Sequence, residues 1–165
     1  MDIFQTDPLP VALDAKFRII GPSGERTLAA ADFFTLPKQN AARENALNDD
    51  EVLASVEFPE SRARSTYHKV LDREAWTHAV VSAAVVLDMD KDVCRSARIV
   101  LGGVAPIPWR VPEAERLLAG QRVTPELTVK VAEAAVAGAN PLAKNKYKVP
   151  LTRETLQRTV LSLGT

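Results

Sequence analysis

The sequence has 165 residues, of which 46% are hydrophobic and 25% are charged, the proportions of a folded globular protein. Its 21 basic and 21 acidic side chains cancel, so no overall field attracts nucleic acid or an anionic membrane. No run approaches the roughly 20 apolar residues that span a bilayer, and the start, Met1 to Gln5, lacks the features of a secretory signal. A single cysteine, Cys94, excludes a disulfide within the chain. We expect a cytoplasmic protein with one compact domain or two small lobes.

The first predicted elements form a hairpin. Lys16 to Ile20 is short and rich in apolar residues, and it runs into the tetrapeptide Gly21-Pro22-Ser23-Gly24. This tetrapeptide predicts a turn, because proline presets φ and glycine tolerates positive φ. Glu25 to Leu28 is the predicted return strand. Ala29 to Phe34 is predicted to form one helical turn, and residues 37–50 a polar surface loop.

The next predicted elements are strands of a larger sheet. Val52 to Phe58 and Ser65 to Val70 are strand candidates. Ala79 to Leu87 is apolar at consecutive positions, which predicts a central strand covered on both faces. Asp88 to Val93 is interpreted as a polar connection, and Ala97 to Val104 as the antiparallel partner.

The last third of the sequence favours helices. Pro112 opens a short helix that Gly120 ends, and Thr124 before Pro125 predicts the start of a second helix that Gly138 closes. Thr152 is the predicted N-cap of a third helix. Strands followed by helices indicate an α+β fold, with an antiparallel sheet and the C-terminal helices packed on one of its faces.

Motifs for metal binding and covalent catalysis are weak. Asp88, Asp90 and Asp92 have the spacing that opens a calcium loop, but the glycine and the glutamate that such a loop requires are missing. His68 and His78 are the only histidines, and neither lies near a cysteine in the sequence. No serine or cysteine stands in a nucleophile motif. We predict no metal site and no catalytic residue.

Other features have both structural and functional interpretations. Gly102-Gly103 is not a dinucleotide loop and favours a close approach of backbone to another segment. Lys144, Lys146 and Lys148 around Tyr147 form either a solvated loop or a surface for an acidic partner. Cys94 is interpreted as a strand-edge residue without a redox role. Lys69 and the segment Asp72 to Trp76 place charges and an indole ring between two strands, where either ligand contacts or surface ion pairs are expected.

The order of segments along the chain resembles a known family. The segments that carry the resemblance are Thr6 to Ala15, GPSGERT, ADFF, NDDEVLASVEFP, YHKVLDREAWTHAVVSAA, ARIVLGGVAPIPWRVPEAERLL, and Asn140 to Leu163. Together they resemble the C-terminal part of the FAD-binding (medium) subunit of molybdenum hydroxylases, the family of xanthine dehydrogenase, aldehyde oxidoreductase and CO dehydrogenase flavoproteins.

The resemblance implies a division of the chain and a set of flavin contacts. It implies that residues 1–60 are a remnant of the second FAD-binding lobe, and that residues 61–165 are the C-terminal α+β domain. Asp7 matches an acidic residue expected to hydrogen-bond the FAD, Leu53 an apolar residue against the ring, and Lys69 a lysine near the isoalloxazine. Trp76 lies in the loop that approaches the flavin in the family.

The glycine-rich pyrophosphate loop and the Gly-Gly-Asn-type segment of the family's N-terminal lobes are absent from this sequence. We therefore expect the isolated chain to bind FAD weakly or not at all, and to be inactive alone, as a truncated or split subunit would be. The resemblance implies electron transfer from iron–sulfur clusters through FAD to an acceptor. The implied partners are a molybdenum cofactor subunit, a 2Fe–2S subunit and a separate FAD lobe, with neither nucleic acid nor membrane. The alternatives are a non-catalytic scaffold that kept the fold, and an unrelated small-molecule binding module with its pocket away from Lys69.

Overall fold

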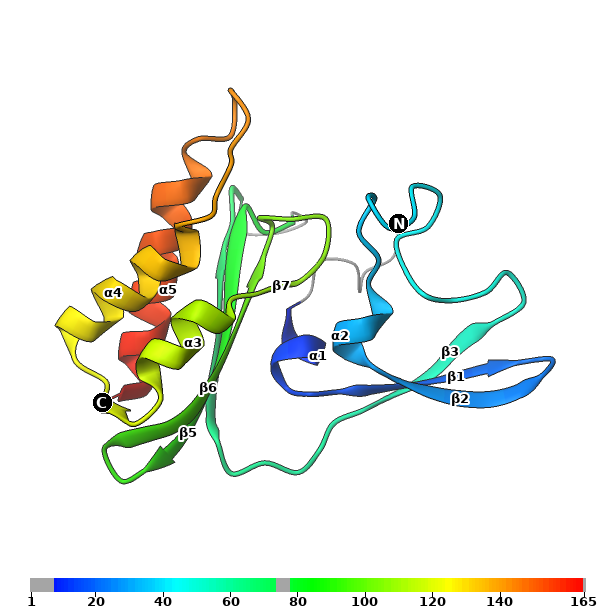
Figure 1. Ribbon diagram of the computed structural model, residues 1–165, viewed down its shortest axis with the longest axis horizontal. Coiled ribbons are helices and arrows are strands. Elements are labelled where there is room, and N and C mark those ends of the chain that lie inside the picture. Colours follow the sequence, from blue (N-terminus) through cyan, green and yellow to red (C-terminus); the bar gives the residue numbers. More distant parts are fainter. Residues whose placement is uncertain (1–7, 74–77, 165) are drawn as a thin grey trace.

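The computed structural model describes residues 8–73 and 78–164. Figure 1 shows two antiparallel sheets side by side, with helices covering the outer face of the larger sheet. The first part of the chain forms a three-stranded sheet of order β2-β1-β3 and two short helices. Its elements are α1 (Leu9–Ala12), β1 (Lys16–Gly21), β2 (Gly24–Ala29), α2 (Ala30–Phe33) and β3 (Val52–Glu57).

The second part of the chain forms a five-stranded sheet and three helices. The strand order is β4-β5-β6-β7, and β8 also pairs with β6. Its elements are β4 (Arg64–Val70), β5 (Val81–Asp90), β6 (Val93–Gly102), β7 (Trp109–Arg110), α3 (Pro112–Leu118), β8 (Gln121–Arg122), α4 (Pro125–Val136) and α5 (Lys148–Gly164). This arrangement confirms the predicted α+β fold with an antiparallel sheet and C-terminal helices.

The small sheet is buried on one face. Phe17 and Ile19 are fully buried, whereas Lys16 and Ile20 beside them are exposed, as the two-residue period of a strand requires. The predicted turn is confirmed, because Gly21 pairs with Gly24 and the φ of Gly24 is 117°. The ring of Phe17 meets that of Phe33 edge-on at a centroid distance of 4.7 Å.

β5 separates two hydrophobic cores, which confirms the prediction of a strand covered on both faces. Ala83, Val85 and Leu87 belong to the core beneath α3, α4 and α5. Ala84 belongs to the other core, together with Phe17 of the small sheet. Consecutive side chains of a strand point to opposite faces, so an apolar run was needed to fill both cores.

The three C-terminal helices pack on one face of the large sheet (Figure 1). Thr124 caps α4 as predicted: its hydroxyl oxygen accepts a hydrogen bond from the Leu127 amide at 3.2 Å. None of the described helices has both the length and the apolar composition that crossing a bilayer requires.

Three local predictions were wrong. Asp88 to Val93 is not an open connection, because β5 extends to Asp90, which pairs with Val93 across a tight turn. Thr152 does not cap the last helix: α5 begins at Lys148, and the Thr152 hydroxyl donates to the Lys148 carbonyl at 2.7 Å inside the helix. Cys94 is not at a sheet edge but fully buried between β5 and β8, and burial raises the pKa of its thiol.

Candidate functional site

The register of β4 on β5 determines which side chains point toward the small sheet. Lys69 lies opposite Ser82, and Tyr67 lies opposite Ala84. Residues directly opposite each other in an antiparallel pair share a face, and Ala84 belongs to the core that contains Phe17. Lys69 and Tyr67 therefore project from the face of the large sheet that turns toward the small sheet.

Leu53 lies on the small sheet. It pairs with the fully buried Ile19 of β1, and its side chain packs against the core shared with Ala84. Leu53 and Lys69 are thus on different sheets, on faces that turn toward one common core. Leu53 packs against this core, whereas Lys69 is exposed and is not part of it.

The other two predicted site residues, Asp7 and Trp76, lie outside the described residues. Asp72 and Arg73, which come before Trp76, are exposed. The exposed side chain of Lys69 has no ion-pair partner among residues 8–73 and 78–164. Lys69 is therefore an accessible cation at the end of β4.

Ser82 is a polar residue of this site that sequence reasoning missed. It is only 1% exposed, and its hydroxyl has no hydrogen-bond partner within the part of the chain that the structure describes. Unsatisfied buried hydroxyls are uncommon in folded proteins. The available signal in the sequence was a single serine inside the apolar run Ala79 to Leu87; its place opposite Lys69 is known only from the strand register.

The two sheets contribute side chains of different character to this side of the molecule. Leu53 is a partly buried apolar side chain on the small sheet, and Lys69 is an exposed cation on the large sheet, whereas the Ser82 hydroxyl is buried. A narrow cavity of about 190 Å³ lies nearby, between α1 and the strands β4 and β5, and Tyr67 lines it. This volume is below the range of roughly 300–1,000 Å³ that is typical of ligand pockets, so it would not hold a dinucleotide by itself.

A hydrogen bond and an ion pair join α1 and the residues after it to the large sheet. One guanidinium nitrogen of Arg98, on β6, donates to the Ala12 carbonyl at 3.0 Å and lies 2.7 Å from a carboxylate oxygen of Asp14. Ala12 is the last residue of α1 and is fully buried. Because the final carbonyls of a helix lack partners within the helix, Arg98 satisfies a group that would otherwise be unpaired. It thereby fixes α1 against the large sheet.

A second ion pair orders the loop beside β3. Both carboxylate oxygens of Glu51 accept hydrogen bonds from Arg26, at 2.7 and 2.8 Å, and one also accepts from the Asn48 amide. These bonds, led by those from Arg26, lower the pKa of Glu51 to about 2. Glu51 directly precedes β3, so this pair holds the strand that carries Leu53.

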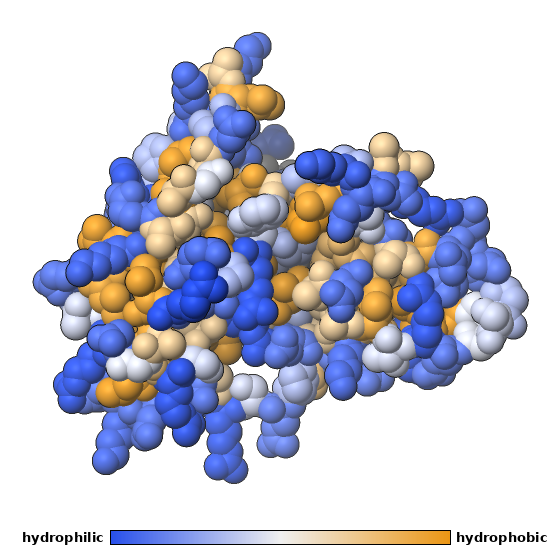
Figure 2. Space-filling model, viewed as in Figure 1, coloured by the Kyte–Doolittle hydropathy of each residue, from blue (hydrophilic) through white to orange (hydrophobic). Residues whose placement is uncertain are grey.

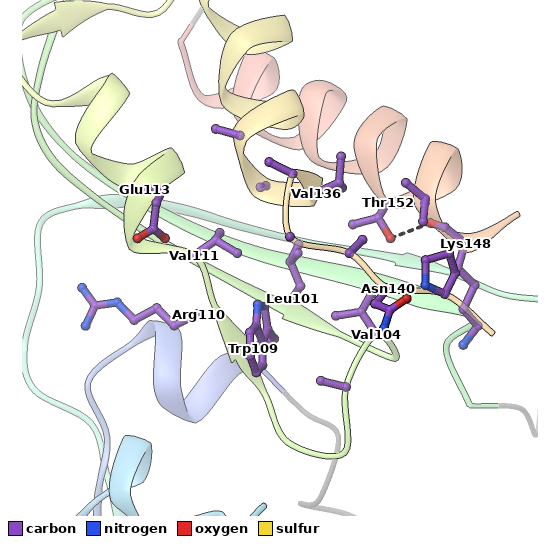
Figure 3. A pocket seen from close by; sticks show the side chains of 18 of the residues that line it. Leu101, Val104, Trp109, Arg110, Val111, Glu113, Val136, Asn140, Lys148 and Thr152 are labelled. Atoms are coloured by element: carbon purple, nitrogen blue, oxygen red, sulfur yellow. Dashed lines mark hydrogen bonds between the residues drawn. The ribbon is translucent and has the colours of Figure 1, made fainter. Parts of the chain in front are cut away.

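A larger groove lies on the helix side of the large sheet (Figure 3). Its volume is about 600 Å³, and the end of α4, the start of α5, β7 and the loop before β7 enclose it. Leu101, Val104 and Trp109 form its apolar floor, while Asn140 and Lys148 lie at its far end (Figure 3). This groove is separate from the face that carries Lys69.

The structure also explains the glycine pair at the end of β6. Gly103 has a φ of 74°, and a Cβ atom there would lie 2.7 Å from the Val80 carbonyl oxygen. The prediction of a close backbone approach is therefore confirmed. Among the described residues, no three His, Cys, Asp or Glu side chains gather in a group that could hold a metal ion.

Comparisons with known proteins identify the family. Residues 66–163 match the family model described as the CO dehydrogenase flavoprotein C-terminal domain. The chain is 34% identical to the aldehyde oxidoreductase FAD-binding subunit PaoB of Escherichia coli, over 87% of this chain and 43% of that protein. It is 31% identical to the carbon monoxide dehydrogenase medium chain of Afipia carboxidovorans, over 90% of this chain and 51% of that protein.

Solved structures agree with these sequence matches. The fold is similar to a chain of quinoline 2-oxidoreductase from Pseudomonas putida 86, with a TM-score of 0.85, 25% identity, and coverage of 98% of this chain and 58% of that chain. It is also similar to a chain of the carbon monoxide dehydrogenase of Hydrogenophaga pseudoflava, with a TM-score of 0.83, 27% identity and the same coverage of both chains. The chain spans about half the length of the curated relatives it matches. It belongs to the CO dehydrogenase flavoprotein C-terminal domain family, found in the FAD-binding subunits of molybdenum-hydroxylase-type dehydrogenases.

Proposed function

We propose that this chain supplies the C-terminal wall of the flavin site in the FAD-binding subunit of a molybdenum-hydroxylase-type dehydrogenase. The observation that carries the proposal is the accessible Lys69 on the face of the large sheet that turns toward the small sheet. In this proposal, residues 1–60 are the end of the second FAD-binding lobe and residues 61–165 are the C-terminal domain. The partners are a molybdenum cofactor subunit and a 2Fe–2S subunit.

FAD would supply the redox chemistry, taking electrons from the iron–sulfur side and passing them to an acceptor. The chain's own residues would bind the flavin ring and tune its reduction potential. The ammonium group of Lys69 stabilises negative charge at the pyrimidine end of the ring. Leu53 packs against the ring system and excludes water from it. Asp7 and Trp76 enter this proposal only through the family resemblance, Asp7 as a hydrogen-bond acceptor.

The 165-residue chain by itself should bind FAD weakly or not at all. Tight binding of a pyrophosphate usually relies on backbone amides of a glycine-rich loop at a helix N-terminus, and this sequence contains no such loop. A few contacts from one wall do not offset the entropy lost when so large a ligand is fixed. A second polypeptide segment that carries the loop would complete the site.

Isolation from the host cell tests the proposal. A tagged chain should be recovered together with molybdenum and iron–sulfur subunits and with flavin visible in the absorption spectrum. A colourless protein that does not co-purify with those subunits would contradict the proposal. It would support a scaffold protein that kept the fold and lost the cofactor. A stoichiometric flavin spectrum from the purified chain alone would contradict the expectation that this chain forms only one wall.

A further inference from the structure

Positive charge is concentrated in one segment of a chain whose total charge is zero. Between Glu133 and Arg153 the sequence contains three lysines and no acidic residue. Two of them, Lys144 and Lys146, lie in the connection between α4 and α5, which we call the basic arm (residues 139–147). Both are exposed and have no ion-pair partner among the described residues. Figure 1 shows the basic arm projecting beyond the helix layer.

The basic arm also exposes large apolar side chains. Leu142 is 75% exposed and Tyr147 is 56% exposed. Among the described residues, Leu142 is the most exposed large hydrophobic side chain. Figure 2 shows hydrophobic and hydrophilic residues side by side on this projecting part. Exposed apolar groups beside charged ones are typical of protein interaction sites.

The basic arm borders the 600 Å³ groove. Asn140 and Asn145 of the basic arm line this groove together with Trp109, which is 43% exposed. The side-chain carbonyl oxygen of Asn145 is buried without a hydrogen-bond partner in the described part of the chain. A polypeptide entering the groove would cover the exposed indole ring of Trp109.

The basic arm is held in place at its base. The Lys148 ammonium group donates to the Gly103 carbonyl at 2.8 Å, which ties the start of α5 to the loop after β6. Two backbone hydrogen bonds order the arm itself. The backbone N–H of Asn145 donates to the Leu142 carbonyl at 3.2 Å, and the backbone N–H of Lys148 donates to the backbone carbonyl of Asn145 at 3.0 Å. A surface with this local order loses less conformational entropy on binding than a free loop does.

We infer that the basic arm and the groove behind it form a docking surface for an acidic segment of a partner subunit. Carboxylates of that segment meet Lys144 and Lys146, and an apolar side chain beside them enters the groove over Trp109. The charge of the basic arm requires a partner of opposite sign. Its apolar residues and the roughly 600 Å³ groove fit a protein segment better than a phosphate backbone. The inference rests on the proposed function, since it takes the partner to be a subunit of the same complex.

The test uses the complex isolated from the host cell through the tagged chain. A carbodiimide joins a lysine amine directly to a carboxylate, so mass spectrometry of the treated complex reports which acidic residues lie against Lys144 and Lys146. We expect cross-links to aspartate or glutamate of the molybdenum or iron–sulfur subunit. Cross-links from these two lysines only to this chain, or to none, would overturn the inference.

Charge reversal gives an independent readout. The double variant K144E/K146E should raise the dissociation constant for the co-purified subunits at least about tenfold at low salt, and the effect should shrink near 0.5 M salt, where the Debye length is only about 4 Å. The matched control is K38E/K130E, which makes the same change in net charge at two exposed lysines outside the groove. The inference would be overturned if both double variants raised the dissociation constant equally, or if K144E/K146E left it unchanged.

The apolar contribution has its own pair of variants. Leu142→Ser should weaken association, whereas Val129→Ser, at a 43% exposed position on α4, should not. Melting curves of the isolated variants establish that each still folds. If the complex retains flavin and both partner subunits while all these variants associate like wild type, the docking inference fails and the proposed function stands. Binding of a short RNA that is lost in K144E/K146E would assign the surface to nucleic acid instead and would also overturn the inference.

Discussion

Replacing Arg98 with methionine tests how α1 is fixed to the large sheet. The charged hydrogen bond to the buried Ala12 carbonyl should contribute about 1.5–3 kcal/mol, because the carbonyl would otherwise be buried without a partner. The ion pair with Asp14 should contribute no more than about 1 kcal/mol, since the Asp14 side chain is 63% exposed. Methionine retains much of the aliphatic length, so Arg98→Met should lower the free energy of unfolding by about 2 kcal/mol.

Urea unfolding of a double-mutant cycle separates the two contributions. Asp14→Asn removes the charge and tolerates the positive φ of 55° at this position, because asparagine adopts that conformation readily. We expect it to cost no more than about 1 kcal/mol, and most of the Arg98→Met effect to persist in its background. Arg95→Met on the same strand is the control, since Arg95 pairs with Asp88 at the exposed surface. If Arg98→Met cost no more than this control, Arg98 would not be fixing α1.

Three further predictions concern stability. Gly103→Ala should lower the free energy of unfolding by at least about 2 kcal/mol more than Gly120→Ala does. Both glycines have a φ near 75°, but only at Gly103 would a Cβ atom collide with backbone atoms. Equal losses of stability in thermal unfolding would refute the close approach. Glu115→Ala should lower the free energy of unfolding by about 3 kcal/mol. It removes a buried carboxylate that accepts hydrogen bonds from two guanidinium nitrogens of Arg110 and from the backbone N–H of Ile99. A loss below about 1 kcal/mol in urea unfolding would contradict this. Glu51 has a folded-state pKa of about 2, below its usual value of 4.5, so its stabilising contribution is present above pH 4.5 and is lost as the pH falls toward 2. Glu51→Gln should flatten the pH dependence of urea midpoints in this window, and profiles parallel to wild type would contradict the assignment.

The elements that the sequence predicted well are those with strong local or periodic signals. The run Ala79 to Leu87 predicted a central strand because both of its faces are apolar, and β5 indeed borders two cores. The turn at Gly21 to Gly24 and the cap at Thr124 follow from residue chemistry that acts within a few positions. Such features depend little on tertiary structure.

The errors came from features that tertiary contacts decide. Pro150 in the first turn of α5 was a better signal for the helix start than Thr152, because proline is tolerated there and the true start is Lys148. The turn between Asp90 and Val93 is tighter than its polar composition suggested, because cross-strand pairing extends to both residues.

The candidate site was predictable only in part. The family resemblance pointed to Leu53 and Lys69, and strand register then placed them on faces that turn toward one core. No local pattern could reveal that Ser82 lies opposite Lys69, or that Arg98 reaches α1 across 86 positions of sequence. These contacts depend on sheet register and on the packing of α1, which local sequence patterns do not reveal.

The flavin midpoint potential of the assembled complex tests most directly whether the cofactor lies against the face that carries Lys69. Lys69→Gln removes a charge that, at roughly 5 Å and an effective dielectric constant of about 20, contributes up to about 3 kcal/mol. We predict a potential more negative by about 30–60 mV, where 30 mV corresponds to roughly 1.4 kcal/mol for a two-electron couple. Lys16→Gln, on the solvent side of β1, should leave the potential unchanged. If the Lys69→Gln complex kept both its flavin content and its midpoint potential, the flavin would not lie against the face that carries Lys69.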